Sequence, residues 1–328
     1  MSLPEIKVCP GSLRTGFQTY SRPVLNRLFN GKQVGHILSF DSPYHGENQP
    51  SSFVESLQQM SISGVQEKFS VRLDGKTLRL IKPGEQGQYI LKPQPRVGKL
   101  SDQMPANEHL TMQLAKQVYQ IETAENALIF FKNGEAAYLT KRFDVLEGGG
   151  KRAQEDFAAL AQRSPQTHGE DYKYQGNYLE FFQLLKRYVP AYTVEAPKLF
   201  RVILFNYLFS NGDAHFKNCS LLQTDMGDFR LSPAYDLLNS RLHIYDQDFA
   251  LAQGLLPPAL AQGKLREQFY QLAALAEINP RTVKRIFESF LSQKEASLEL
   301  IENSFLSPRC KRSYQQAYLS RWNKLTRA

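Results

Sequence analysis

The alternation of apolar and polar residues predicts a group of strands in the first half of the chain. Residues Lys68–Leu73 alternate in this way, which is typical of a strand with one buried face. Asp74-Gly75 follows as a hairpin turn signal and leads into a second strand at Thr77–Ile81. Three more short strands are expected at Gln88–Lys92, Ala127–Phe131 and Ala136–Thr140.

Helical spacing of apolar residues dominates after Arg142. The segment Lys198–Ser210 is strongly apolar and predicts a buried helix. Before Arg142, a helix is expected at Asn107–Tyr119, where apolar residues recur every three or four positions. The other helices that this spacing predicts are Arg22–Leu28, Lys151–Gln162, Tyr178–Tyr188, Arg266–Ala276, Pro280–Gln293 and Arg312–Leu325.

This order of elements, strands first and helices second, suggests an α+β fold with two lobes. We expect residues 1–50 to form an N-terminal arm and residues 51–140 to form a small β-rich lobe. Residues 141–328 would then form a larger helical lobe, with a hinge near Lys141–Asp144.

Composition and charge narrow the class of protein. The 328 residues are 42% hydrophobic, which allows a sizeable core. The formal charge of +8 comes from scattered residues, so an ordinary basic surface is favoured over a dedicated nucleic-acid site. Cys9, Cys219 and Cys310 form no Cys-x-x-Cys pair, which argues against a zinc site or disulfide framework and for a reducing cytoplasm. Neither a membrane helix nor a secretory signal is expected.

Two segments past the middle of the chain carry the most informative chemistry. They are Asn211-Gly-Asp-Ala-His-Phe-Lys-Asn218 and Leu231-Ser-Pro-Ala-Tyr-Asp-Leu237. Asp213 and Asn218 have the Asp-x-x-x-x-Asn spacing of a kinase catalytic loop, and Asp236 follows where a second magnesium-binding residue is expected. Phosphoryl transfer needs oxygen ligands for Mg²⁺ and a carboxylate that accepts a hydroxyl proton.

Residues beside this loop and on the strands are further candidates. Lys217 is a candidate for neutralising charge on the transferred phosphoryl group, and His215 for orienting the loop, although a purely structural role for His215 is about as good an interpretation. Lys92 ends a predicted strand, where kinases place a cation against the ATP phosphates. Lys82 and Lys99 compete for that role, and Glu108 is a candidate partner for Lys92.

The segment before the first strand, Ser61-Ile-Ser-Gly-Val-Gln-Glu-Lys68, contains one glycine. As a phosphate-covering loop it is a weak signal taken alone, because a Gly-x-Gly-x-x-Gly loop is much richer in glycine. A serine- and glycine-containing turn is the alternative.

These segments resemble the HipA family of bacterial serine/threonine kinase toxins when they are taken together. The resemblance runs in order from about residue 60 to residue 240. It is carried by Ser-x-x-Gly-x-Gln-x-Lys at 61–68, Ile-Leu-Lys-Pro at 90–93, Asn-Glu at 107–108, Lys-Arg-Phe-Asp at 141–144, Gln-Glu-Asp-Phe at 154–157, the 211–218 run and Tyr-Asp-Leu at 235–237.

The resemblance implies a bilobal protein-kinase-like fold and a role for each matched residue. Asp213 would be the catalytic base, and Asn218 and Asp236 would hold Mg²⁺. ATP would contact Lys92, the Phe143 segment at the hinge and the 61–68 loop. The residues it assigns to ATP are Lys92, Phe143, Gly64, Val65, His215 and Lys217, with Ser61 and Ser63 as sites of autophosphorylation.

The resemblance also implies partners. Members of the family phosphorylate aminoacyl-tRNA synthetases, with tryptophanyl- and glutamyl-tRNA synthetases as the candidate substrates. Only about 50 residues precede the phosphate-covering loop, so the chain looks like the short toxin HipT of three-gene modules. A small HipS-like protein and a DNA-binding HipB-like protein would be its antitoxins, and contact with DNA would be indirect. Lys141 stands where HipA has an acidic residue.

Two other classes of function remain open from the sequence. A small-molecule or lipid kinase would share the same catalytic geometry but transfer phosphate to a metabolite. A basic, non-catalytic interaction protein would instead bind DNA in a strongly salt-dependent way. No helix-turn-helix pattern or basic helix favours the second alternative.

Overall fold

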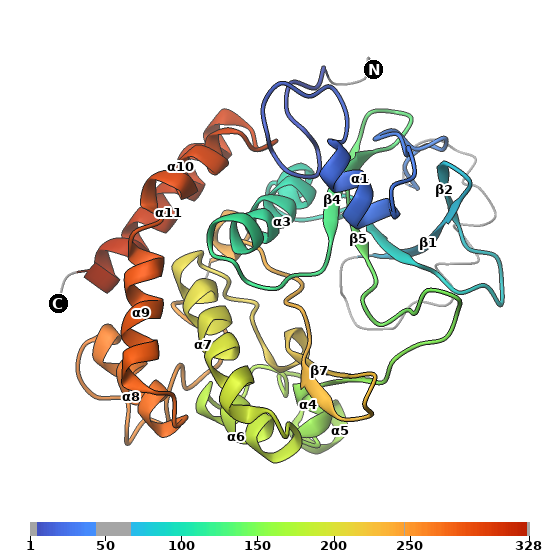
Figure 1. Ribbon diagram of the computed structural model, residues 1–328. Helices are drawn as coiled ribbons and strands as arrows, with labels where there is room; N and C mark the ends of the chain where they lie inside the picture. The colour runs from blue at the N-terminus through green and yellow to red at the C-terminus, as the bar shows by residue number, and fades with distance from the viewer. Residues whose placement is uncertain (1–4, 44–66, 246, 327–328) are drawn as a thin grey trace.

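The computed structural model describes residues 5–43, 67–245 and 247–326. The first part of the chain forms a five-stranded antiparallel sheet, and the second part is mainly helical. In Figure 1 the sheet lies on the right and the C-terminal helices, orange to red, lie on the left.

The sheet is built from local hairpins in the strand order β2-β1-β3-β5-β4. The first hairpin turns at Asp74-Gly75, where Asp74 pairs with Thr77 and Gly75 adopts a φ of 61°, which glycine tolerates without strain. All five predicted strands are confirmed. Their bounds are β1 (Phe69–Asp74), β2 (Thr77–Leu80), β3 (Tyr89–Lys92), β4 (Asn126–Phe130) and β5 (Ala136–Lys141).

The N-terminal residues pack against one face of this sheet. Helix α1 (Arg22–Phe29) confirms the short helix expected there and buries its apolar side. The Tyr20 hydroxyl donates a hydrogen bond to the carbonyl of Leu128 at 2.6 Å. The backbone N–H of Leu38 donates to the carbonyl of Phe130 at 2.7 Å. The segment therefore completes the core of the sheet.

Helix α3 (Met104–Gln113) covers the opposite face of the sheet. The alternation along β4 shows the two faces, because Ala127 and Ile129 join the core under the N-terminal segment whereas Leu128 joins the core that includes α3. The helix predicted here is confirmed, and it continues as a π-helical turn (Leu114–Val118). Nearly every residue of α3 is buried, including its polar ones.

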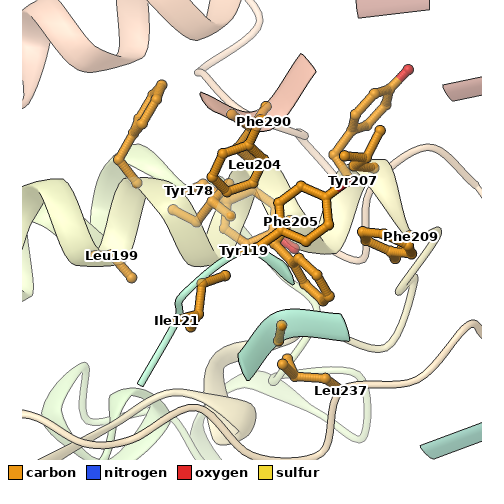
Figure 2. Close-up of a cluster of buried hydrophobic side chains, with 14 of the residues drawn as sticks. Tyr119, Ile121, Tyr178, Leu199, Leu204, Phe205, Tyr207, Phe209, Leu237 and Phe290 are labelled. Carbon is orange, nitrogen blue, oxygen red and sulfur yellow. The ribbon is translucent and has the colours of Figure 1, made fainter. Parts of the chain in front are cut away.

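The helical part is organised around α7 (Tyr192–Leu208). In Figure 2 apolar side chains of α7, such as Leu204 and Phe205, lie beside Tyr119. The ring centroid of Tyr119 lies 5.4 Å from that of Phe205 and 4.8 Å from that of Phe290, which belongs to a later helix. Helix α7 begins earlier than predicted, because Pro197 removes one backbone donor without ending the helix. The other longer helices are α6 (Leu179–Tyr188), α8 (Leu265–Leu275), α9 (Pro280–Leu291), α10 (Lys294–Glu302) and α11 (Pro308–Thr326).

The helices at 178–188, 266–276, 280–293 and 312–325 are thus confirmed with small shifts, and α10 was not predicted. Within the described ranges, no helix combines the length and the apolar character that crossing a membrane requires.

The helix predicted over Lys151–Gln162 is wrong. Strand β6 (Gln154–Asp156) occupies its middle, and only a short helix, α4 (Phe157–Leu160), follows. Strand β6 pairs with β7 (Ser220–Gln223), which pairs in turn with β8 (Phe229–Leu231). The local helical spacing was overridden by this partner strand more than sixty residues further along the chain, as residue pairs such as Asp156 with Ser220 show.

Candidate functional site

Lys92 lies at the centre of a group of charges between the sheet and the helical part. It ends β3, its side chain is buried, and its Nζ atom lies 2.7 Å from Glu108 Oε1 and 2.6 Å from Asp236 Oδ1. Glu108 belongs to α3, and Asp236 follows β8. Three separate segments of the chain therefore meet at one ammonium group, and the pairing of Lys92 with Glu108 that the sequence left open is observed.

The charged side chains in this group shift one another's pKa values. Burial alone would lower the pKa of Lys92, but the carboxylates of Asp236 and Glu108 raise that pKa above its ordinary value. Burial would raise the pKa of Asp236, but the Lys92 charge holds it below the ordinary value. Burial raises the pKa of Glu108 against the pull of Lys92. Lys92 and Asp236 are thus an ion pair at neutral pH.

The backbone at Asp236 is strained, since its φ of 55° is uncommon for a residue with a side chain. The segment before it is fixed by backbone hydrogen bonds. Ala234 donates from its N–H to the carbonyl of Glu122 at 2.8 Å and accepts from the N–H of Ala124 at 3.0 Å. These contacts hold the strained residue where its carboxylate reaches Lys92.

Asp213 lies in the polar loop that follows α7. The loop is anchored where Gly212 donates from its N–H to Ser240 Oγ at 2.7 Å. Tyr174 donates its hydroxyl to Asp213 Oδ1 at 2.6 Å, and 42% of the Asp213 side chain is exposed. The carboxylate is therefore oriented by one partner and open to solvent.

Asn218 closes the same loop. Its Nδ2 atom donates to the backbone carbonyl of Asp213 at 2.7 Å. This contact uses the nitrogen of the amide, so the Oδ1 atom is left for another partner.

His215 interacts with both aspartates of the site. Its Nε2 atom is 3.7 Å from Asp213 Oδ1, and its ring packs at 4.9 Å from the ring of Tyr174. Burial lowers the pKa of His215 to about 4, and the carboxylates of both Asp213 and Asp236 oppose that shift. The imidazole is neutral at neutral pH and lies near both carboxylates.

A tyrosine joins the two segments that carry the candidate metal ligands. The Tyr235 hydroxyl donates to the backbone carbonyl of Lys217 at 3.0 Å, so the residue before Asp236 lies against the residue before Asn218. Phe143 packs on Tyr235 with their ring centroids 5.9 Å apart. The side chain of Lys217 is exposed. The structure thus brings together the residues that the sequence singled out on both segments.

Asn107 connects α3 to the segment after Asp236. Its Nδ2 atom donates to the carbonyl of Asn239 at 2.9 Å and to His243 Nε2 at 2.8 Å, while its Oδ1 atom accepts from the N–H of Asn239 at 3.1 Å. His243 Nδ1 in turn lies 3.0 Å from the carbonyl of Lys99, which fixes the proton on Nδ1. Both amide protons of Asn107 are therefore used.

The donor atoms at the site fit a hard divalent cation such as Mg²⁺. Asn218 has its Oδ1 atom left over, and within the described ranges Asp236 Oδ2 has no protein partner. The part of the chain that the structure describes contains no group of three His, Cys, Asp or Glu side chains that could hold a metal ion. Mg²⁺ is commonly bound by one or two protein oxygens together with substrate phosphates, and this pair of residues matches that pattern.

Comparison with known proteins identifies the family of the chain. Residues 60–298 match the family of HipA-like C-terminal domains. The chain belongs to the HipA-like family. The HipA family that the sequence resembled is therefore confirmed.

Curated relatives of this HipA-like chain cover the same region. A protein of Haemophilus influenzae named "Putative kinase" is 26% identical over 245 residues, covering 73% of this chain and 68% of the relative. A protein of Sinorhizobium fredii, also named "Putative kinase", is 30% identical over 240 residues, covering 68% of this chain and 55% of the relative. The chain spans little more than half the length of the second relative.

Two solved structures share the fold. A HipA toxin–antitoxin complex with HipB and operator DNA from Shewanella oneidensis superposes with a TM-score of 0.62 at 19% identity, covering 87% of this chain and 73% of that one. The proinflammatory kinase CtkA of Helicobacter pylori gives a TM-score of 0.52 at 13% identity, covering 77% and 92%. The expected α+β, kinase-like fold with a β-rich and a helical part is confirmed.

Some expected site residues of the HipA-like chain lie outside the described residues. These are the loop residues Ser61, Ser63, Gly64 and Val65. Lys141 is described, and its Nζ atom contacts Asn30 Oδ1 at 2.7 Å beside α1.

Sequence reasoning missed Tyr174 and Asn107 as partners of the HipA-like site. Tyr174 lies 39 positions before Asp213 in a stretch without periodic spacing, so nothing in the sequence pointed to their contact. Asn107 stands in the Asn-Glu pair that carried part of the resemblance, and that pair was the available signal.

Proposed function

We propose that the chain is a protein kinase that transfers the γ-phosphoryl group of ATP to a serine or threonine hydroxyl. The observation that supports this most is the ion pair between Lys92 and Asp236, beside the loop that carries Asp213 and Asn218. The site thus contains both a fixed cation for phosphate and a solvent-accessible carboxylate, and phosphoryl transfer requires these two groups.

Asp213 would accept the proton of the attacking hydroxyl. The new bond forms between the hydroxyl oxygen and the γ-phosphorus, and ADP leaves with the bridging oxygen. Tyr174 would orient the carboxylate through its hydrogen bond to Oδ1. His215 is neutral and buried, so it would support the loop rather than supply positive charge.

Nucleotide would contact residues on both sides of the site. Lys92 would hold the α- and β-phosphates, and Lys217 would lie where charge develops on the transferred group. Phe143, which packs on Tyr235, would line the adenine pocket. Asn218 and Asp236 would hold Mg²⁺ through their remaining oxygens, and Mg²⁺, when bound, neutralises phosphate charge.

The wider role that fits this chemistry is that of a toxin kinase in a bacterial toxin–antitoxin module. Membership of the HipA-like family and the fold shared with a HipA that assembles with HipB and DNA support this role. The substrate would be an aminoacyl-tRNA synthetase, tryptophanyl or glutamyl, in the cytoplasm. HipS-like and HipB-like antitoxins would be partners of a HipT-like chain, and Ser61 and Ser63 would be sites of autophosphorylation.

Brief induction of the intact chain followed by phosphoproteomics tests this function. Asp213→Asn removes the base while preserving the shape of the side chain. Asp225→Asn makes the same change at an exposed ion pair with Arg152 and serves as the control. Phosphorylation of a synthetase serine should appear with the intact and control chains and be absent with Asp213→Asn. Phosphate on metabolites and on no protein would instead indicate a small-molecule kinase.

A further inference from the structure

A hollow in the structure is lined by residues other than the candidate site residues. It is a cavity of about 140 Å³ between the turn after α3, one side of α7 and the end of β8. Gln120 and Glu122 line it from the turn, and Lys198 and Arg201 line it from α7. Leu231, which ends β8, and the next residue, Ser232, complete the lining. None of these residues has a part in the proposed phosphoryl transfer.

Arg201 is the unusual group in this cavity. Its Nη2 atom donates to the carbonyl of Tyr119, and its guanidinium lies 5.3 Å from the ring centroid of Phe290. Within the described part of the chain, no carboxylate pairs with it, and its Nε and Nη1 atoms make no hydrogen bond. Burial lowers the pKa of Arg201, yet arginine stays charged in proteins. Nε and Nη1 of Arg201 are not fully buried, so an anion that enters the cavity can reach these donors and form charge-assisted hydrogen bonds with them.

The acidic groups around the cavity are already engaged by other cations. Glu195 Oε1 lies 2.6 Å from Lys198 Nζ, and its Oε2 accepts from the N–H of Leu231 at 3.3 Å. Glu122 accepts twice from Arg230 Nη1, at 3.0 and 3.1 Å. Arg201 is therefore the surplus positive charge at the wall of the cavity.

We infer that this cavity binds a small organic anion, with a carboxylate or phosphate group on a compact apolar body. The anionic group would meet the free donors of Arg201, with Lys198 one helical turn away on the same side of α7. Leu231 and Val202 supply apolar wall for the body of the ligand. The volume is close to that of an engineered cavity of about 150 Å³ that holds benzene.

The walls of the cavity lead directly to the residues of the site. Helix α7 runs into the loop that carries Asp213, and β8 runs into the segment of Asp236. Ala234 donates to the carbonyl of Glu122 at 2.8 Å, and Asp236 is two residues further on. If the proposed kinase function is right, the ligand is coupled to nucleotide binding, because both depend on the position of this backbone.

Titration with benzoate, with benzyl alcohol as its uncharged counterpart, tests the binding site. Isothermal calorimetry should show saturable binding of benzoate, at least about tenfold tighter than benzyl alcohol, because a charged hydrogen bond contributes that much. Methyl resonances of Val202 and Leu231 should shift on titration. Equal affinities for the two compounds, or methyl shifts absent from these two residues, overturn the proposal.

Variants of the two cations sharpen this test. Arg201→Gln should weaken benzoate binding at least about tenfold, and Lys198→Gln, which is more exposed, about threefold. Arg201→Lys keeps the charge and should retain part of the affinity. Since Arg201 also holds the carbonyl of Tyr119, its replacement could unfold the chain. In that event the benzoate affinity of Lys198→Gln and the comparison with benzyl alcohol test the binding site. An unchanged benzoate affinity in Lys198→Gln counts against the site.

The coupling between ligand binding in the cavity and nucleotide binding is measured separately. The dissociation constant of a fluorescent ATP analogue, measured with and without saturating benzoate, should change about threefold or more, and benzoate affinity should change by the same factor. An unchanged constant overturns the coupling while the binding site stands. Failure of the analogue to bind at all would count against the proposed kinase function, independently of the calorimetry.

Discussion

Lys92 and Asp213 belong to different segments of the candidate site and are held in different ways. Lys92 is fixed by two carboxylates that come from positions 16 and 144 residues further along the chain. Asp213 belongs to a loop that is closed by its own residues, since Asn218 donates to the Asp213 carbonyl five positions away. We call the first group, Lys92, Glu108 and Asp236, the lysine side and the second, Asp213, His215 and Asn218, the loop side.

The difference lies in what each side needs from the rest of the molecule. The lysine side consists of charges that are buried or partly buried, and it exists only when α3, the sheet and the segment after β8 are all in place. The loop side needs the end of α7 and neutral hydrogen-bond partners from elsewhere in the chain, such as Tyr174 and Ser240, but no buried ion pair. Changes on the loop side should therefore affect chemistry, whereas changes on the lysine side should affect the fold as well.

Replacing the candidate base should give the largest effect and confine it to chemistry. Asp213→Asn should lower kcat by about a thousandfold, because a positioned general base contributes on the order of 10² to 10⁴ in rate. The melting temperature and the affinity for an ATP analogue should stay close to those of the wild type. Single-turnover transfer of labelled phosphate measures the rate, with Asp225→Asn as the control. A similar loss of rate in both variants would contradict the assignment.

Removing Lys92 should affect stability as well as nucleotide binding. Lys92→Met leaves Glu108 and Asp236 facing each other without a cation, and breaking such a buried pair destabilises by about 3 kcal/mol. Lys76→Met, at the exposed β1–β2 turn, makes the same change and should be neutral. Urea unfolding measures both. The double variant Lys92→Met with Glu108→Gln should recover part of the loss, and additive losses would exclude coupling between the two side chains.

The difference between local contacts and contacts with distant segments also explains which features the sequence could predict. Hairpins such as β1–β2 and the spacing of Asp213 and Asn218 are local, so the order of residues was enough to find them. Strand β6 was missed because its partner, β7, lies far along the chain. The polar residues of α3 are buried only because distant groups satisfy them, and no local pattern specifies those partners.

Asn107 offers a way to weaken the lysine side without replacing Lys92, Glu108 or Asp236. Asn107→Asp removes the two donors that reach Asn239 and His243 and sets a carboxylate against a carbonyl. Leaving these buried groups unpaired should cost about 2–3 kcal/mol. The affinity for nucleotide should fall more than kcat, because α3 carries the partner of Lys92. Asn323→Asp, on the exposed surface of α11, is the matched control. Equal effects on kcat and affinity would contradict a positioning role.

Acid should give the smallest effect, and it probes two buried histidines: His109, next to Glu108 in α3, and His215, on the loop side. Burial lowers the pKa of His109 to about 4, and its Nδ1 atom has Asn126 Oδ1 as its partner at 3.0 Å. His215, on the loop side, has a pKa lowered to about 4 as well. In the unfolded chain histidine titrates near its ordinary pKa of about 6.5. The unfolded state therefore binds more protons as the pH falls from about 6.5 toward 4, and stability is lost over that window.

At pH 5 this loss should amount to about 2 kcal/mol for His109 relative to pH 7. His109→Gln removes the titration, so its stability should fall less between pH 7 and pH 5 than that of the wild type, and urea unfolding at both pH values measures the difference. The comparison must be between variants, because the raised pKa of Glu108 acts in the opposite direction and gains stability on acidification. His168→Gln, on the exposed surface, should leave the wild-type slope unchanged. If His109→Gln and His168→Gln lose the same stability between pH 7 and pH 5, the titration of His109 in α3 does not cause the acid sensitivity, and another group does.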